Sequence, residues 1–269
     1  MKLDSLGLLC CPTCRGSLVL YEQPADDVVA DGTLSCERCR RSFAVKNNIV
    51  RFLRASDLAG SNKRHEKLNN LFSYVYTPAV KLMFAVCGGE DSARRECMSR
   101  LELREGAKIL EVGIGTGDNL PYLRPHAHGF EVYGVDISRS MLRHCAGNLK
   151  RWGLRAELFL AEAEHLPFKD GVFDVVFHLG AINFFTDQKR AIVEMIRVAR
   201  PGSKIVIADE SEKALKVLDK FLLQLWIGRR EKVVPPIDLV PPTMLESRLD
   251  TIWRGYGYCI EFRTPPQRW

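Results

Sequence analysis

The sequence predicts an α/β fold built on a mostly parallel sheet, with a small metal-stapled domain before it. Three observations lead to this expectation. Segments of strand and helix character alternate from about residue 96 onward, which predicts a parallel sheet with helices on both faces. A glycine-rich turn follows the first of these strands, and two Cys-x-x-C pairs lie near the N-terminus. The chain therefore divides into an appendage, a joint and a larger α/β domain.

Length and composition fit this division. The 269 residues suffice for one full α/β domain plus a small appendage, and 46% hydrophobic with 27% charged residues is typical of a globular protein. No apolar run approaches the roughly 18 residues that span a bilayer, so no membrane span is expected. The net charge of +6 permits an anionic partner without demanding one. Nine cysteines without the spacing of a disulfide framework favour a reducing, cytoplasmic location.

The two Cys-x-x-C pairs predict a structural zinc site. Twenty-one residues separate Cys11 and Cys14 from Cys36 and Cys39. Each pair can hold one face of a tetrahedral ion, and a segment of about 50 residues buries too little core to fold without such a staple. We therefore expect residues 1–55 to form a zinc ribbon with these four ligands. A redox Cys-x-x-C is the weaker alternative, because the βαβ context of such motifs is missing.

Short strands are expected at residues 17–21 and 32–35, followed after the second cysteine pair by an aromatic residue, a turn and a hydrophobic strand over residues 43–53. This arrangement resembles the small zinc-ribbon proteins that partner and activate RNA and protein methyltransferases. The resemblance implies a possible protein partner. From Cys36 to Arg54 there are six basic residues and one acid, a strip that could contact RNA phosphates, although such strips are more often solvated surface.

The glycine turn predicts a nucleoside site. A strand over residues 108–112 runs into Gly113, Gly115 and Gly117, and Asp136 closes the next strand, over residues 131–136. Glycine lets the backbone turn sharply and approach a ligand, and the acid can accept hydrogen bonds from two ribose hydroxyls.

The spacing of the glycines distinguishes between nucleosides. A dinucleotide site needs G-x-G-x-x-G, but here Asp118 stands in the last position, where its charge would repel a diphosphate and tolerate a zwitterionic methionine tail. With Glu111 before it, the E-x-G-x-G-x-G pattern resembles motif I of the class I S-adenosylmethionine (SAM)-dependent methyltransferases. NAD binding and a chance glycine turn remain the alternatives.

This resemblance implies a Rossmann-like class I methyltransferase sheet and a set of SAM-contacting residues. Glu162, where the family usually has aspartate, would accept a hydrogen bond from the adenine amino group, and the Ala163 amide would face a ring nitrogen. The fourth strand, residues 173–178, would open onto the methyl-transfer site. The implied cofactor-binding residues are Glu111, Gly113, Gly115, Gly117, Asp136, Ile137, Glu162, Ala163, His178 and Leu179.

His178 is the candidate catalytic residue, either as a general base, since an imidazole titrates near neutrality, or as a pocket wall. The helical joint, residues 56–95, is placed like the segment that covers the SAM pocket in the ubiquinone and menaquinone methyltransferases. Tyr74 and Tyr76 are therefore candidate lid residues, with simple packing as the alternative. Residues 96–269 form the expected catalytic domain, with helices after Ser138 and Asp187, a fifth strand at 203–208 and a closing hairpin over 251–262.

Three interpretations of function remain open. A SAM-dependent methyltransferase acting on a small aromatic, quinone-like or lipid-like acceptor is favoured by Tyr74, Tyr76, Phe184, Phe185 and a proline-rich wall over residues 233–242. An RNA methyltransferase is favoured by the ribbon and its basic strip. A non-enzymatic sensor with the ribbon as a docking module has no positive support in the sequence.

Overall fold

The computed structural model describes residues 1–21, 27–53, 60, 62, 84–85, 88–124, 128–219 and 232–267. The candidate lid residues Tyr74 and Tyr76, and most of the predicted joint, lie outside these ranges.

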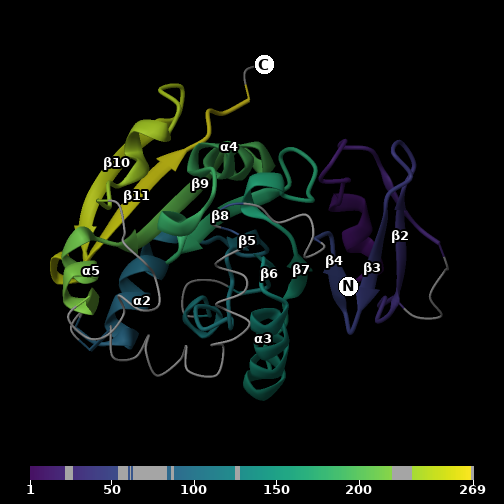
Figure 1. Ribbon diagram of the computed structural model, residues 1–269, viewed down its shortest axis with the longest axis horizontal. Coiled ribbons are helices and arrows are strands. Elements are labelled where there is room, and N and C mark those ends of the chain that lie inside the picture. The colour runs from purple at the N-terminus through teal and green to yellow at the C-terminus, as the bar shows by residue number, and fades with distance from the viewer. Residues whose placement is uncertain are drawn as a thin grey trace.

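A single eleven-stranded sheet runs through the molecule in the order β1-β2-β3-β4-β7-β6-β5-β8-β9-β11-β10 (Figure 1). Its catalytic part has five mutually parallel strands and a closing antiparallel pair. Their bounds are β5 Lys108–Val112, β6 Glu131–Asp136, β7 Glu157–Leu160, β8 Phe173–Leu179, β9 Ala199–Glu210, β10 Leu245–Ile252 and β11 Gly257–Arg263. The predicted α/β class is confirmed, and the closing hairpin begins at Leu245, earlier than the sequence indicated.

Local signals set the ends of the helices. Ser138 Oγ accepts a hydrogen bond from the Met141 amide at 3.2 Å and so caps α3, which Gly153 ends at a φ of 62°. Asp187 caps α4 by accepting from the Arg190 amide at 2.9 Å. The α-helices are α2 Glu90–Met98, α3 Arg139–Trp152, α4 Gln188–Val198 and α5 Glu212–Asp219. The 3-10 helices are η1 Leu3–Leu8, η2 Ser99–Leu101, η3 Leu120–Tyr122, η4 Ala163–His165, η5 Ile182–Phe184, η6 Pro236–Leu239 and η7 Trp253–Gly255.

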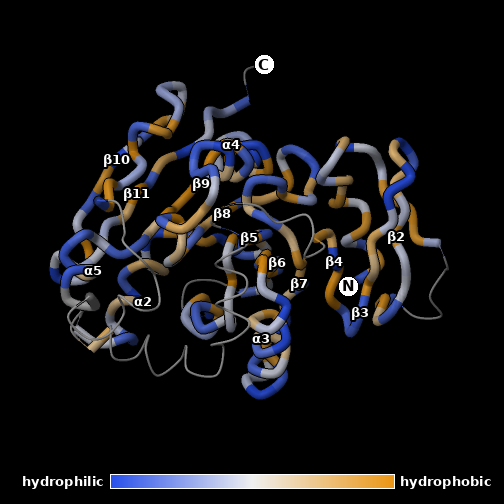
Figure 2. The backbone as a smooth tube through the Cα atoms, in the orientation of Figure 1, coloured by the Kyte–Doolittle hydropathy of each residue, from blue (hydrophilic) through white to orange (hydrophobic). Residues whose placement is uncertain are grey.

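Two hydrophobic clusters cover the two faces of the sheet. The apolar stripe of α4 packs on one face, while α2 and α3 pack on the other. Figure 2 shows hydrophobic residues concentrated along the strands between these layers. Buried strands such as β8 are mostly apolar because both of their faces are covered.

The N-terminal ribbon is built into the same sheet. Its strands are β1 Leu18–Leu20, β2 Gly32–Cys36, β3 Ser42–Lys46 and β4 Ile49–Arg51. β4 pairs in parallel with β7, placing Ile49 opposite Leu158 and Arg51 opposite Leu160 (Figure 1). β7 would otherwise be an open edge with unpaired backbone groups. The sequence indicated two domains but not that one sheet joins them.

Side chains reinforce this junction. Arg15 of the ribbon donates to the buried carboxylate of Glu194 on α4 at 2.5 Å. The Cys10 amide donates to the Pro167 carbonyl at 2.9 Å. Buried ribbon residues also share one hydrophobic cluster with aromatic side chains of the catalytic part, namely Tyr133, Phe159, Phe168 and Phe173. The ribbon and the catalytic part therefore pack as one continuous core.

Among the residues the structure describes, no helix is long and apolar enough to cross a membrane.

Candidate functional site: a nucleoside pocket and a four-cysteine centre

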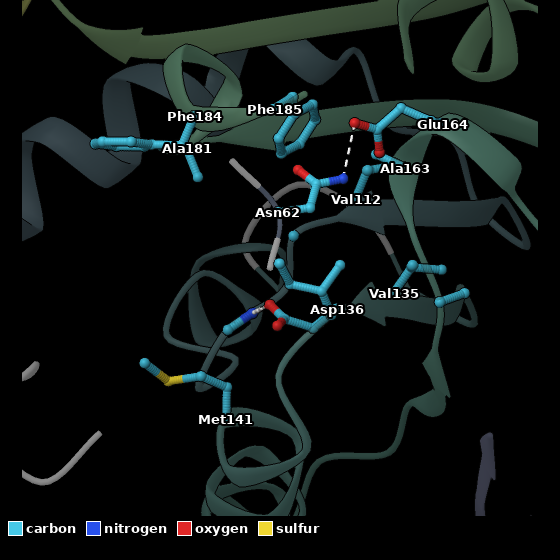
Figure 3. Close-up of a pocket in the computed structure, with 15 residues that line it drawn as sticks. Asn62, Val112, Val135, Asp136, Met141, Ala163, Glu164, Ala181, Phe184 and Phe185 are labelled. Atoms are coloured by element: carbon cyan, nitrogen blue, oxygen red, sulfur yellow. Dashed lines mark hydrogen bonds between the residues drawn. The ribbon is translucent and has the colours of Figure 1, made fainter. Parts of the chain in front are cut away.

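A pocket opens where β5, β6, β7 and β8 end, and Figure 3 shows side chains from these segments facing it. It holds about 640 Å³ of empty space, including the part open to solvent. Ligands of open α/β sheets bind at this carboxyl edge, because the loops that follow the strands can diverge there. The lining residues are Asn62, Val112, Gly113, Gly115, Val135, Asp136, Ile137, Met141, Ala161, Ala163, Glu164, Gly180, Ala181, Phe184 and Phe185.

Asp136 is one of two acidic residues that line the pocket, with Glu164, and it is hydrogen-bonded to the glycine turn. Its carboxylate accepts hydrogen bonds from the Gly115 amide at 2.9 Å and the Ser138 amide at 2.7 Å (Figure 3 marks the first). Burial raises the pKa of Asp136 to about 6, although these amides act in the opposite direction. The side chain is held in one orientation with lone pairs left to accept from a ligand.

Glu111 lies beneath the turn and outside the pocket lining. It is fully buried, accepts from Asn119 Nδ2 at 2.6 Å, and has its second oxygen without a hydrogen-bond partner in the described structure. Arg94 of α2 in turn donates to Asn119. Burial raises the pKa of Glu111 to about 8. Glu111 thus holds the turn in place from below and links it to α2.

His178 is completely buried behind the turn. Its Nδ1 lies 2.6 Å from the Val112 carbonyl oxygen, which can only accept, so Nδ1 carries the proton. Burial lowers the pKa of His178 to about 4, which leaves the ring neutral, and Nε2 is buried without a hydrogen-bond partner in the described structure. A Cβ on Gly113 would lie 3.2 Å from this ring, so the glycine permits the close approach.

The segment after β8 forms the aromatic side of the pocket. Ala181 has a φ of 133°, which a residue with a Cβ rarely adopts, and it follows Gly180 at a φ of 74°. This sharp turn brings Phe184 and Phe185 to the pocket, where the Phe185 ring lies 5.0 Å from that of His178. The apolar character expected here is present.

Asn62 is a pocket residue that the sequence did not point to. Its Nδ2 donates to Glu164 at 2.9 Å and to Glu162 at 3.2 Å, and its Oδ1 accepts from the Thr186 amide at 3.1 Å. Polar residues such as Asn62 are common in joints, so no local pattern distinguishes it. Glu164 lines the pocket, whereas Glu162 lies just outside the lining and contacts it through Asn62.

The structure brings together five of the predicted cofactor residues at the lining: Gly113, Gly115, Asp136, Ile137 and Ala163. The other predicted residues, Glu111, Gly117, Glu162, His178 and Leu179, surround it without lining it. Gly117 packs on α3, where a Cβ would come within 2.8 Å of Cys145 Sγ. Met141, in the first turn of α3, lines the pocket and was also missed.

The four predicted metal ligands form a compact centre within the ribbon. The Sγ atoms of Cys11, Cys14, Cys36 and Cys39 all lie within 4.8 Å of one another. The two knuckles match: the Arg15 amide donates to the Cys11 carbonyl at 2.8 Å, and the Arg40 amide donates to the Cys36 carbonyl at 3.0 Å. Both arginines have a φ near 60° (62° and 61°).

The centre fits a tetrahedral zinc ion. Four thiolates from two knuckles supply the donor set of structural zinc sites. Gly16 packs against them so closely that a Cβ would lie 2.9 Å from Cys36 Sγ. A redox pair would need only two of these thiols, so the arrangement favours the structural metal over redox chemistry.

Comparison with known proteins identifies both parts. Residues 110–207 match the family described as a methyltransferase domain, and residues 2–48 match the family described as Trm112p-like protein. A ubiquinone/menaquinone biosynthesis C-methyltransferase UbiE from Ralstonia pickettii is 34% identical over 140 residues, which cover 49% of this chain and 57% of that relative. The chain thus spans little more than half the length of this curated relative.

Solved structures show the same fold. A possible histamine N-methyltransferase from Thermotoga maritima aligns over 74% of this chain and 98% of its own, with a TM-score of 0.56 and 18% identity. A chain from the complex between the Haloferax volcanii Trm112 methyltransferase activator and a putative methyltransferase aligns over 67% of this chain and 94% of its own, with a TM-score of 0.54 and 18% identity. The chain therefore contains a Trm112p-like segment, whose four-cysteine centre fits a zinc ion, followed by a segment that matches the methyltransferase-domain family and has the fold of the solved SAM-dependent methyltransferases.

Proposed function

We propose that this protein transfers the methyl group of SAM to a small aromatic, quinone-like or lipid-like acceptor. The observation that carries the proposal is the joining of Asp136, held by the glycine turn, with the apolar side chains of Met141, Phe184 and Phe185 in one pocket. A polar nucleoside site and an apolar acceptor site are both needed. Similarity to a quinone C-methyltransferase supports this acceptor class.

The pocket suggests how the methyl donor would bind. Asp136 would accept hydrogen bonds from ribose hydroxyls, and the backbone at Gly113 and Gly115 would approach the methionine portion. The Ala163 amide would face adenine, with Glu162 as the predicted acceptor of its amino group and Glu164 as the acid that lines the pocket. The bound sulfonium supplies an already activated methyl group.

The chain's own residues would then mainly position the acceptor, since in-line alignment accounts for much of the acceleration of such transfers. His178 would act as a rigid wall in this proposal. Its neutral ring is held by the Val112 carbonyl, and Nε2 would serve as a general base only if the acceptor reached it past Phe185. A soft carbon acceptor needs no dedicated base.

The ribbon's proposed role is to support the catalytic domain from within the chain. The β4–β7 pairing and the Arg15–Glu194 ion pair attach the ribbon to the catalytic domain. The ribbon would therefore take the place that a separate protein partner could occupy on that domain. None of the eight cysteines in the described ranges forms a disulfide. We therefore place the protein in a reducing location such as the cytoplasm.

Calorimetry tests the donor site. Asp136→Ala should weaken SAM binding by about 1–3 kcal/mol, because a charged acceptor of ribose hydroxyls is lost. Asp238→Ala, which removes an exposed acid on η6, is the matched control and should bind SAM normally. Equal SAM affinity in the Asp136 variant and the wild type would refute the assignment.

Labelled SAM tests the acceptor. The purified protein is incubated with separate RNA, protein and lipid or small-molecule extracts, and each fraction is counted. Label in the small-molecule or lipid fraction supports the proposal. Label in RNA would overturn the preferred acceptor, and absence of label everywhere despite tight SAM binding would favour a sensor.

A further inference from the structure

Three arginines meet where the ribbon joins the catalytic domain. Arg51 ends β4 opposite Leu160, the last residue of β7, and the next residue, Ala161, lines the pocket. Arg139 is the first residue of α3, which begins just after the pocket residues Asp136 and Ile137. All three elements reach the carboxyl edge of the sheet, where the pocket opens.

The side chains point toward the same region. Ile49, two residues before Arg51 on β4, packs in the cluster that also contains Leu142 and Cys145 of α3, so Arg51 shares the α3 face of the sheet. Arg139 and Arg143 are one helical turn apart and therefore lie on the same side of α3. The pKa of Arg51 is lowered by burial and then by the positive charges of these two arginines, in agreement with this placement.

In the part of the chain that the structure describes, none of the three guanidinium groups forms an ion pair. Asp31 is the acid whose charge reaches Arg51, and its carboxylate accepts from the Asn47 amide at 3.4 Å. Arginines elsewhere, such as Arg100 and Arg197, contact carboxylates directly.

Arg51 also carries a buried donor without an acceptor. Its Nε is shielded from solvent and has no hydrogen-bond partner in the described structure. Leaving a buried donor without an acceptor destabilises the protein, and more so when the group is charged. Three like charges brought together around such a donor indicate that an anionic ligand completes the site.

We propose that Arg51, Arg139 and Arg143 bind a phosphate group of the methyl acceptor. Guanidinium groups match phosphate oxygens with paired hydrogen bonds, and three of them would neutralise its charge. The site lies on the pocket's edge, so a bound phosphate would anchor an acceptor whose reactive part enters the pocket. The acceptor's identity rests on the proposed methyl transfer, but the phosphate site itself does not.

Two probes test the site on the zinc-loaded full chain: inorganic pyrophosphate by calorimetry, and a labelled single-stranded RNA oligonucleotide of mixed sequence by fluorescence anisotropy. The variant Arg51→Gln, Arg139→Gln, Arg143→Gln should weaken binding of the preferred probe about tenfold or more at low salt, because three phosphate contacts are lost. Tight pyrophosphate binding with weak RNA binding would identify a small phosphorylated acceptor. Preference for RNA would identify a nucleic acid acceptor.

The control variant Lys46→Gln, Lys150→Gln, Arg151→Gln removes the cation at the end of β3, which pairs with the opposite end of β4 from Arg51, and two cations from the last turn of α3. It should retain binding within about twofold, since only distant, screened charges are lost. Equal loss in both variants, or no binding of either probe to the wild type, would overturn the proposal. SAM affinity is measured on every variant. If SAM binding is normal but the triple arginine variant binds the phosphate probes as the wild type does, this site alone is rejected. If the wild type does not bind SAM, the proposed function is rejected.

Discussion

The two edges of the catalytic part of the sheet are held by different physical means. At the ribbon end, β4 covers the edge of β7, and the ribbon behind it is organised by four cysteines and a shared apolar core. At the other end, β10 is largely exposed and β11 is held by a cluster of charges around Glu261. The first edge contains the candidate metal centre, and the second is held by ion pairs.

The charged cluster is built on a fully buried acid. Glu261 contacts Arg100 at 2.5 Å, Lys204 at 2.8 Å and Arg248 at 2.9 Å. Burial alone would raise the pKa of Glu261, but the three cations outweigh it and lower the pKa to about 2. The two edges of one sheet can therefore be destabilised separately. Metal chelation should destabilise the ribbon edge, and removal of charge should destabilise the edge at β11.

Loss of zinc should have the largest effect. Cys36→Ser should bind little zinc and lose several kcal/mol of stability, because metal binding supplies much of the folding free energy of such small domains. Zinc content and thermal unfolding measure this. The control is Cys10→Ser, whose thiol contacts the Phe168 carbonyl and lies outside the four-cysteine centre. Full zinc occupancy in Cys36→Ser would mean that the ligands are wrongly assigned.

Charge removal at the opposite end should come next. Glu261→Gln removes the buried carboxylate that Arg100 and Lys204 share. Arg100 keeps Asp250 and Lys204 keeps Glu102, so we expect a loss near the lower end of the about 3–5 kcal/mol that breaking a buried pair costs. Denaturant unfolding measures the loss, while zinc content should not change. Glu246→Gln, at an exposed acid paired with Arg263, is the control and should be nearly neutral. Zinc loss in Glu261→Gln would show that the two ends are not independent.

Acid should separate the ends further. Because the folded-state pKa of Glu261, about 2, lies below its ordinary value of 4.5, its stabilisation is complete above about pH 4.5 and disappears as the pH falls through 2. The difference in unfolding free energy between wild type and Glu261→Gln should shrink by about 3 kcal/mol over that range. Comparing the two proteins cancels acid effects on the ribbon. A constant difference would contradict the assigned pKa.

The smallest effect should come from the exposed member of the same cluster. The side chain of Arg248 is 57% exposed, whereas that of Lys204 is 4% exposed. Solvent screens an exposed pair, so Arg248→Gln should cost less than about 1 kcal/mol in denaturant unfolding. If Arg248→Gln lost as much unfolding free energy as Glu261→Gln, the exposed ion pair rather than the buried ones would stabilise this edge.

Local signals explain what could be predicted of the fold. The glycine turn, the caps at Ser138 and Asp187 and the bounds of β5 and β6 all depend on neighbouring residues, so the sequence reveals them. The cysteine spacing revealed the four-thiol centre for the same reason. The predicted roles of Glu162 and His178 stay predictions, because contact with a ligand decides them.

Long-range placement explains the rest. Asn62 meets Glu164 from a hundred and two positions away, a contact that no periodicity encodes. The β4–β7 pairing joins two segments that the sequence predicts as separate domains. The pairing could not be predicted, because it is made by backbone hydrogen bonds, which do not depend on particular side chains. From the sequence one could predict the α/β methyltransferase fold, the acid that lines the pocket and the cluster of four cysteines, because each depends on particular residues at short spacing. The pairing of the ribbon with β7 and the position of Arg51 beside α3 are visible only in the tertiary structure, because both depend on the packing of segments that are distant in the sequence.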